Sequence, residues 1–277
     1  MKKIIITADD YGMCDDVDQA IDAGIENGFI TTTNVILNMG SLCSAATLRQ
    51  RYPHISIGVH WNVTSGKPIC NISDIPSLVD AHGNFWSLKE FKRRYSKRKI
   101  APEELEKELE AQYARFEDVC LKADYWNTHE NSALHTKAFY VFARVAQKHG
   151  ISATRTFQRV YYDKIDIGLK RELREFAVRI FFDFWFTHIR KSFKMPSARI
   201  VSFDKISKLE GDNLLNALLN CRQDLIEVVV HPALTTNNPF FGNISEERVK
   251  EYILVTSEEI KNRYQEKGIE FVSFAEL

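Results

Sequence analysis

The chain has 277 residues, a length that fits one large α/β domain or two smaller domains. Hydrophobic residues make up 44% and charged residues 27%, a composition that argues against a disordered chain. Lys plus Arg and Asp plus Glu number 37 each, so no overall field would attract nucleic acid or an anionic membrane surface. We therefore expect a small, locally recognised substrate, with no nucleic acid and no membrane as partner.

Cysteine usage and the amino-terminal residues predict a cytoplasmic protein. The five cysteines are widely spaced and contain no CxxC pair, so we expect reduced thiols. The apolar run after Lys2 and Lys3 is too short for a secretory signal. No stretch approaches the roughly 18 uncharged apolar residues of a transmembrane helix.

Strands and helices alternate along the first part of the chain. A β-branched run at residues 3–8 predicts a strand buried on both faces, and apolar residues at helical spacing from Val17 to Ile25 predict the helix that follows. A strand at 31–37, a helix at 45–51 and a strand at 55–60 come next. The following loop contains Gly66, Pro68, Pro76 and Gly83, and it is too long to be a mere connection.

The same alternation continues to the end of the chain. Pro102 starts a charged amphipathic helix that we expect to run to residue 122. The further predicted elements are strands at 124–128, 151–156, 226–231 and 270–273, and helices at 136–148, 213–220 and 246–267. Because strands and helices alternate with no linker between them, the pattern favours a single α/β domain over residues 1–277.

An aromatic segment around residues 160–195 interrupts this pattern. Residues 169–189 have a helical period and are rich in aromatic side chains between Phe176 and Phe186. Such a stripe is most often a helix packed in the core or at a dimer interface, and the latter would make a homodimer possible. The alternative is a cap whose aromatic side chains line a substrate cleft.

Four predicted strands end on residues that can bind a metal or move a proton. They are Asp9 and Asp10 in IIITADD, His60 in ISIGVH, His129 in ADYWNTH and His231 in IEVVVH. The carboxyl ends of parallel strands meet at one edge of a barrel-like sheet, where the loops carry the chemistry. We therefore expect these side chains to form one polar site.

Each of these residues also has a structural interpretation when it is taken alone. Asp-Asp before Tyr-Gly is good turn chemistry, and a single histidine at a strand end is more often a hydrogen-bonded structural residue. Their joint occurrence favours a metal site instead. One carboxylate with two imidazoles leaves coordination positions open for water and substrate, as hydrolytic metal catalysis requires.

Other histidines and other catalytic schemes have less support. His135 could approach the site or start the next helix, and the remaining histidines have no ligand partner at a suitable spacing; these are His54, His82, His149 and His188. There is no GxSxG elbow, no GxxxxGK[ST] phosphate loop and no GxGxxG turn. No cysteine lies at a predicted strand end.

Five segments together resemble the YdjC-like, or chitooligosaccharide deacetylase-like, carbohydrate deacetylases. They are TADDYGMCDDVDQAIDAGIENGFITTTNVILN, GVHWNVTSGKP, WNTHENSALH, VVVHPAL and LVTSEEIKNRYQEKGIEFVSFAEL. The resemblance covers nearly the whole chain in order and is weakest over residues 160–190. It implies a single-domain, distorted (β/α) barrel of the glycoside hydrolase/deacetylase type that uses a divalent metal to remove an N-acetyl group from an amino sugar or oligosaccharide.

The resemblance also implies a role for each residue of the expected site. Asp10, His60 and His129 would be the metal ligands, Asp9 the base that deprotonates the attacking water, and His231 the acid that protonates the leaving amine. Arg155 falls where the family has an arginine at the site, which would orient a carboxylate or bind substrate. We assign Trp61, directly after His60, to substrate binding as well.

One run departs from the family pattern. The family has His-x-His-x-His after the strand predicted at 124–128, whereas here Glu130 and Asn131 follow His129 and the next histidine is His135. The first histidine is retained, so the departure concerns substrate contacts more than the metal. Two imidazoles and one carboxylate suit zinc on ligand softness, and the family is associated with magnesium, so we expect one divalent ion, Mg or Zn.

Other functions remain open at this point. The same ligands could serve a metal-dependent phosphoesterase or another amidohydrolase, although the chain lacks a phosphate cradle. The His129-Glu130-Asn131 run also fits a sugar-binding protein whose catalytic site has degenerated.

Overall fold

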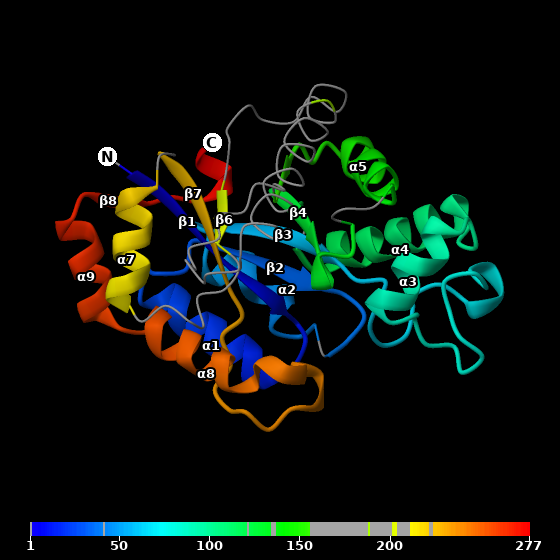
Figure 1. Ribbon diagram of the computed structural model, residues 1–277, viewed down its shortest axis with the longest axis horizontal. Helices are drawn as coiled ribbons and strands as arrows, with labels where there is room; N and C mark the ends of the chain where they lie inside the picture. Colours follow the sequence, from blue (N-terminus) through cyan, green and yellow to red (C-terminus); the bar gives the residue numbers. More distant parts are fainter. Residues whose placement is uncertain are drawn as a thin grey trace, which may run out of the picture.

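The strands of the protein form one parallel sheet that curls into a half-barrel (Figure 1). The computed structural model describes residues 2–40, 42–120, 122–133, 137–155, 188, 201–203, 211–221 and 224–277. The order of the strands is β5-β4-β3-β2-β1-β7-β6, and β8 pairs with the first residues of β1. The strands are β1 (Lys2–Tyr11), β2 (Thr32–Ile36), β3 (Ser56–Trp61), β4 (Tyr125–Thr128), β5 (Ala153–Thr154), β6 (Val201–Phe203), β7 (Leu225–Val230) and β8 (Ile269–Phe271).

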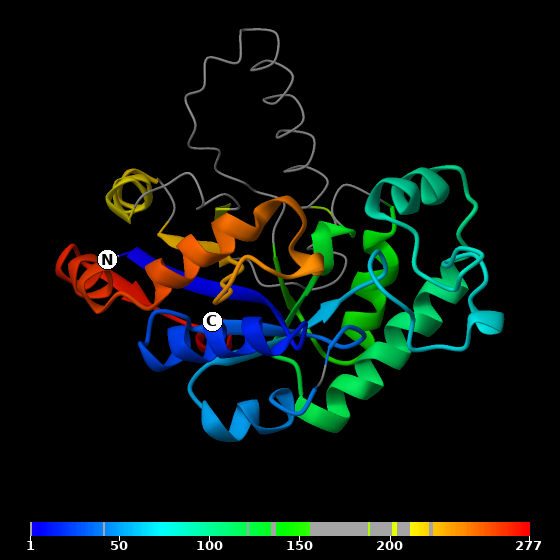
Figure 2. The same cartoon turned by 90° about the horizontal axis from the view of Figure 1, so that it is seen from below.

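Helices cover the outer side of this sheet (Figures 1 and 2). The α-helices are α1 (Asp15–Glu26), α2 (Ala45–Arg51), α3 (Leu88–Ser96), α4 (Pro102–Cys120), α5 (Phe139–Lys148), α7 (Gly211–Asn220), α8 (Ser245–Val255) and α9 (Glu258–Glu266). Helix α4 packs against α2 and α5, and α1 packs against α8. Short 3-10 helices are η1 (Ile72–Asp74), η2 (His129–Asn131), η4 (Pro239–Ile244) and η5 (Phe274–Glu276). The expected distorted β/α barrel is confirmed.

Several predicted elements differ in detail from the observed ones. The long loop after β3 contains α3, which the sequence did not predict, and β6 was also missed. The helix predicted at 246–267 is divided into α8 and α9, because the Ser257 side chain accepts a hydrogen bond from the amide of Ile260 and so caps a new helix. Strand β1 runs on through Tyr11 instead of ending at Ala8.

The central strands are buried on both faces, as their near-continuous apolar sequences predict. Ile4, Ile5 and Ile6 of β1 are fully buried. Between the sheet and the helices, the ring of Trp61 lies 5.5 Å from that of Trp126 and 6.0 Å from that of Phe142. These aromatic contacts fix β3 and β4 against α5.

Tyr125 connects the packing of the sheet to its polar centre. Its ring stacks on Phe274 at 4.4 Å and lies directly over Gly58 of β3. A Cβ atom on Gly58 would come within 2.3 Å of that ring and 2.9 Å of the Tyr125 carbonyl oxygen. Glycine at position 58 therefore allows Tyr125 to place its hydroxyl beside Asn34 and Asn127.

The aromatic segment, with its suggested cap or dimer interface around residues 160–195, lies outside the described residues except for His188. His135 also lies outside them. Among the helices that are described, none is long and apolar enough to cross a membrane.

We expect Gly58→Ala to lower the free energy of unfolding by about 1–3 kcal/mol, because the added methyl group overpacks against both the ring and the backbone of Tyr125. The measurement is urea unfolding followed by circular dichroism. Gly150→Ala is the control: Gly150 has φ +71° with no atom within 4 Å of an added Cβ, so only backbone strain of about 1 kcal/mol applies. A loss at Gly58 no larger than that at Gly150 would contradict the packing argument.

Candidate metal centre and active site

The end of β1 brings two adjacent carboxylates to one place by leaving regular strand geometry. Along a regular strand, Asp9 and Asp10 would point to opposite faces of the sheet. The pairing of β1 with β2 shifts register between Ala8 and Tyr11, and Asp10 has a left-handed φ of 76°. The turn that follows is held by Asp18, whose Oδ1 accepts a hydrogen bond of 2.6 Å from the amide of Gly12.

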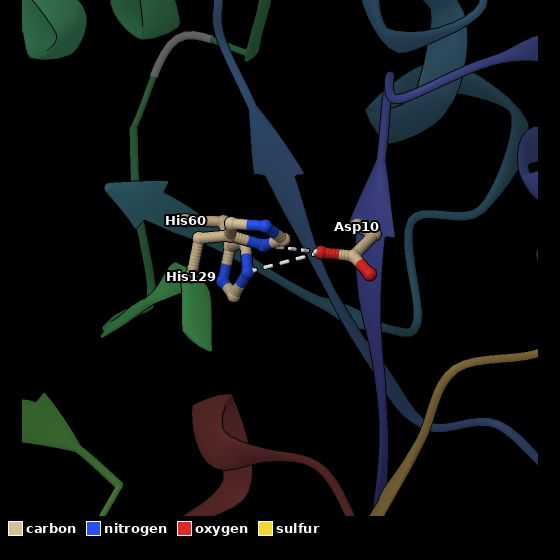
Figure 3. A group of neighbouring side chains, drawn as sticks. All are labelled: Asp10, His60 and His129. Carbon is tan, nitrogen blue, oxygen red and sulfur yellow. Dashed lines mark hydrogen bonds and ion pairs between the residues drawn. The ribbon is translucent and has the colours of Figure 1, made fainter. Parts of the chain in front are cut away.

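Asp10, His60 and His129 form a compact cluster of metal-binding groups (Figure 3). Oδ1 of Asp10 lies 3.2 Å from Nε2 of His60 and 3.0 Å from Nδ1 of His129. One donor atom from each residue lies within 4.8 Å of the others. A carboxylate and two imidazoles converging in this way are a donor set that fits a divalent transition ion.

The orientation of His60 is fixed by its other ring nitrogen. Nδ1 of His60 lies 2.5 Å from Oδ1 of Asn127, so Nδ1 carries the proton and Nε2 presents its lone pair to the cluster. The amide nitrogen of the same Asn127 donates to Oδ1 of Asp9 at 3.1 Å. Asn127 therefore connects a candidate metal ligand with the neighbouring carboxylate.

Asp9 does not belong to the metal cluster, since its oxygens are engaged by other groups. Arg155 forms two parallel hydrogen bonds with it, of 2.7 Å to Oδ2 and 2.8 Å to Oδ1. Asn34 donates a further bond of 2.7 Å to Oδ1. The remaining Arg155 nitrogen, Nε, donates to Glu227 at 3.2 Å. Asp9 is thus a rigidly held carboxylate within a fully buried ion-pair network.

Both aspartates are ionised despite their burial. Burial alone would raise the pKa of Asp9, but the charge and hydrogen bonds of Arg155 outweigh it and hold the pKa well below its usual range. Burial would also raise the pKa of Asp10, which the Arg248 charge and the His129 interactions hold far below the usual value. Both carboxylates therefore stay ionised at neutral pH.

His231 faces Asp9 from the end of β7. Its Nε2 lies 3.7 Å from Oδ2 of Asp9, and its side chain is 27% exposed. The surrounding protein desolvates the ring and lowers the pKa of His231 below 6.5, although Asp9 and Asp10 act in the opposite direction. Behind it, Glu251 of α8 accepts a 2.6 Å hydrogen bond from the His231 amide, and its carboxylate lies 3.9 Å from Nδ1.

Arg248 of α8 completes the buried part of the site. Its Nη2 lies 2.5 Å from Oδ2 of Asp10, the oxygen that faces away from the imidazoles. Its Nη1 donates a long hydrogen bond of 3.5 Å to the His231 carbonyl, and its guanidinium stacks over Phe241 at 4.7 Å. Arg248 is 3% exposed. One face of α8 therefore supplies both a cation and, through Glu251, a carboxyl group.

The two predicted substrate-binding residues, Arg155 and Trp61, make their contacts within the protein. Arg155 is 4% exposed and bonded to Asp9 and Glu227, which favours the carboxylate-orienting role over substrate binding. Trp61 is fully buried, and its indole nitrogen donates to the Leu109 carbonyl at 3.2 Å. An indole with no exposed surface cannot contact a sugar, so we assign Trp61 to packing of the core.

Sequence reasoning missed six residues of this network: Asn34, Tyr125, Asn127, Glu227, Arg248 and Glu251. Asn34 and Glu227 carried a signal, because a polar residue in the middle of an apolar strand must be paired. Arg248 and Glu251 carried none, since they lie among the many charges of the EERVKEY run.

Comparison with known proteins places this architecture in a family. Residues 3–266 match the model of YdjC-like proteins. The chain belongs to the YdjC-like family. Proteins named carbohydrate deacetylase from Brevibacillus brevis and Clostridium beijerinckii are each 25% identical to it. The alignments cover 99% of this chain and 99% and 100%, respectively, of the two relatives.

The fold of this YdjC-like chain also occurs among crystal structures. A candidate cellobiose-phosphate cleavage protein from Enterococcus faecalis superimposes with a TM-score of 0.74 at 24% sequence identity. The match covers 99% of this chain and 98% of that protein. This likeness shows that the two proteins share their fold.

The buried Glu251 generates a prediction for the YdjC-like chain in the absence of metal. Burial raises the pKa of Glu251 from 4.5 to about 7, so the folded state keeps this proton at pH values where the unfolded chain releases it. The protonated Glu251 therefore contributes its full stability below pH 4.5, and this contribution is lost as the pH rises through 7. Relative to Glu251→Gln, the wild type should lose about 3 kcal/mol of unfolding free energy between pH 4.5 and 8.

Urea unfolding in the presence of a chelator, at several pH values, measures this difference. Glu246→Gln on the exposed side of the same helix is the control, and its curve should run parallel to that of the wild type. Parallel curves for Glu251→Gln as well would show that Glu251 keeps an ordinary pKa in the folded protein.

Proposed function

We propose that this protein is a metal-dependent carbohydrate deacetylase that hydrolyses the N-acetyl group of an acetylated amino sugar or oligosaccharide. The observation that carries the proposal is the convergence of Asp10, His60 and His129 next to a separate pair, Asp9 and His231. Hydrolysis of an amide needs a polarised carbonyl, an activated water and a protonated leaving nitrogen. The two groups of residues can divide these tasks.

The three residues Asp10, His60 and His129 would hold one divalent cation. When bound, this ion supplies Lewis acidity, which polarises the acetyl carbonyl and lowers the pKa of water. The two imidazoles favour zinc, whereas the resemblance to YdjC-like deacetylases implies magnesium, so both ions belong in the assay. His60 is held ready for this role by Asn127.

Asp9 is the proposed base. Its Oδ2 is the oxygen nearer to His231 and accepts one hydrogen bond from Arg155. Its Oδ1 accepts from Arg155, Asn34 and Asn127. These donors keep the carboxylate ionised and in one orientation, which is the preorganisation that a general base requires. Arg155 is in turn held by Glu227, so the base is positioned by a network rather than by a single contact.

His231 is the proposed acid for the leaving nitrogen. Because its lowered pKa leaves the ring mostly neutral at pH 7, it must receive a proton before it can donate one. Asp9 lies 3.7 Å away and takes a proton from the attacking water, so it can pass that proton on to His231. His231 and His129 are the partly exposed members of the site, with 27% and 13% of their side chains accessible, and substrate would approach on their side.

Acetate release tests the proposed activity directly. Purified protein with added Zn or Mg should liberate acetate from at least one member of a panel of N-acetylated mono- and oligosaccharides. If no acetate is released from any of these sugars, the proposed activity is wrong. Faster turnover of a generic phosphodiester than of any acetylated sugar would favour a phosphoesterase instead.

Two substitutions separate metal binding from proton transfer. Asp10→Asn should weaken metal binding by at least about tenfold, because it removes the only anionic ligand of the cluster. Asp9→Asn should keep the metal affinity within a few-fold of the wild-type value. It should reduce the rate of acetate release by about 10²–10⁴-fold, the usual contribution of a general base. Isothermal titration calorimetry and an acetate assay provide the two measurements.

Asp118→Asn, an exposed position on α4, is the matched control and should change neither quantity. If Asp9→Asn lost its metal together with Asp10→Asn, the division of roles would be wrong. A protein that binds metal and sugar but has no turnover to lose would instead be a binding protein with a degenerate site.

A further inference from the structure

Arg248 occupies an unusual position for a residue next to a candidate cation site. It bonds to Oδ2 of Asp10, while Oδ1 of the same carboxylate faces His60 and His129. The two oxygens of Asp10 are therefore divided between a guanidinium and the metal-binding cluster. A cation held at Oδ1 would be separated from the positive charge of Arg248 only by the carboxylate itself.

Two properties of Arg248 show that this contact is built into the fold. The side chain is 3% exposed and stacks on Phe241, so the guanidinium cannot turn away into water. Its Nε is buried and has no hydrogen-bond partner among the described residues, so the hydrogen bonds that the side chain makes with them come from its terminal nitrogens, Nη1 and Nη2. Those nitrogens reach Asp10 at the end of β1 and the His231 carbonyl at the end of β7.

Electrostatics excludes tighter metal binding as the benefit of this contact. Like charges separated by a few ångströms in a water-poor site repel strongly, so Arg248 lowers the affinity for any cation at the cluster. Arg248 also occupies the oxygen that Asp10 would need in order to bind a metal through both oxygens. Both effects weaken cation binding, and the second also leaves a coordination position unfilled by protein.

We propose that Arg248 is a positioning residue that restricts Asp10 to a single-oxygen metal ligand, which keeps a coordination position available for water or the acetyl oxygen. A catalytic metal site needs such open positions, whereas a purely structural site fills them with protein ligands. The inference rests on the proposed metal-dependent function. It names the contact between Arg248 and Asp10 as the reason why the protein would leave a coordination position of the metal open.

Arg248→Met tests this inference, because methionine keeps an apolar stem against Phe241 and removes the charge and the donors. The variant should bind Zn or Co about fivefold more tightly or better, since repulsion is removed and Oδ2 is released. Its kcat at saturating metal should fall at least about tenfold, because the second oxygen can fill an open position. Metal affinity is measured by competition with a chromogenic chelator.

Thermal unfolding gives a second measurement that does not depend on turnover. Without metal, Arg248→Met leaves Asp10 as a buried carboxylate that has lost its cationic partner, so the apo protein should melt at a lower temperature than the wild type. Saturating Zn should then raise the Tm of the variant by more than it raises the Tm of the wild type, because the metal replaces the missing charge. The visible spectrum of the Co-loaded variant should also differ from that of the wild type.

Arg248→Lys retains the charge and should be closer to the wild type than Arg248→Met in both metal affinity and kcat. Arg144→Met, which removes an exposed arginine paired with Glu106 on the surface, is the matched control and should change neither. If the Met variant does not fold, Arg248→Gln provides the same loss of charge while keeping one donor for Asp10.

The outcomes separate this inference from the proposed function. A wild type that binds no divalent cation refutes the metal-dependent function itself. A wild type that binds metal, together with an uncharged variant that binds it equally well or more weakly, overturns only the role of Arg248. Tighter binding with a reduced kcat, and recovery by lysine, supports it.

Discussion

The burial of two adjacent carboxylates at the end of β1 is the constraint on which the site depends. Each buried ion carries a desolvation penalty of several kcal/mol, and two like charges on neighbouring residues add repulsion. The protein meets this with a separate arginine for each: Arg155 for Asp9 and Arg248 for Asp10. These arginines come from distant parts of the chain, one directly after β5 and one from α8. The two carboxylates therefore have different surroundings: Asp10 faces the imidazoles of His60 and His129, and Asp9 faces His231.

The parallel sheet is what allows such distant residues to meet. Positions 9, 60, 129 and 231 lie within two residues of the carboxyl ends of β1, β3, β4 and β7, which meet at one edge of the sheet. Below them, Asn34 of β2 and Glu227 of β7 point into the network from within the strands. The site consequently has two layers: a buried layer that fixes orientation and a partly exposed layer, His129 and His231, that can contact substrate.

The sequence predicted the upper layer better than the lower one, for a physical reason. Strand ends are recognisable because an apolar run stops at a histidine or aspartate, and this pattern identified the members of the cluster. The partners of these residues depend on tertiary contacts: Arg248 is one charge among several on an amphipathic helix, and nothing local distinguishes it from its exposed neighbours. The left-handed Asp10 that brings both carboxylates to one site was likewise not predictable from residue types, since aspartate only tolerates that conformation.

The same reasoning explains the error at Trp61. Its position directly after His60 suggested a place at the mouth of the site, but successive residues of a strand face opposite sides of the sheet. If His60 points into the polar centre, then Trp61 must point to the helix-covered face, where it packs on Trp126 and Phe142. Period-two alternation applied to β3 alone would have excluded Trp61 as a sugar contact. At a strand end, therefore, only every second residue is available for chemistry unless a register shift intervenes, as it does at Asp9 and Asp10.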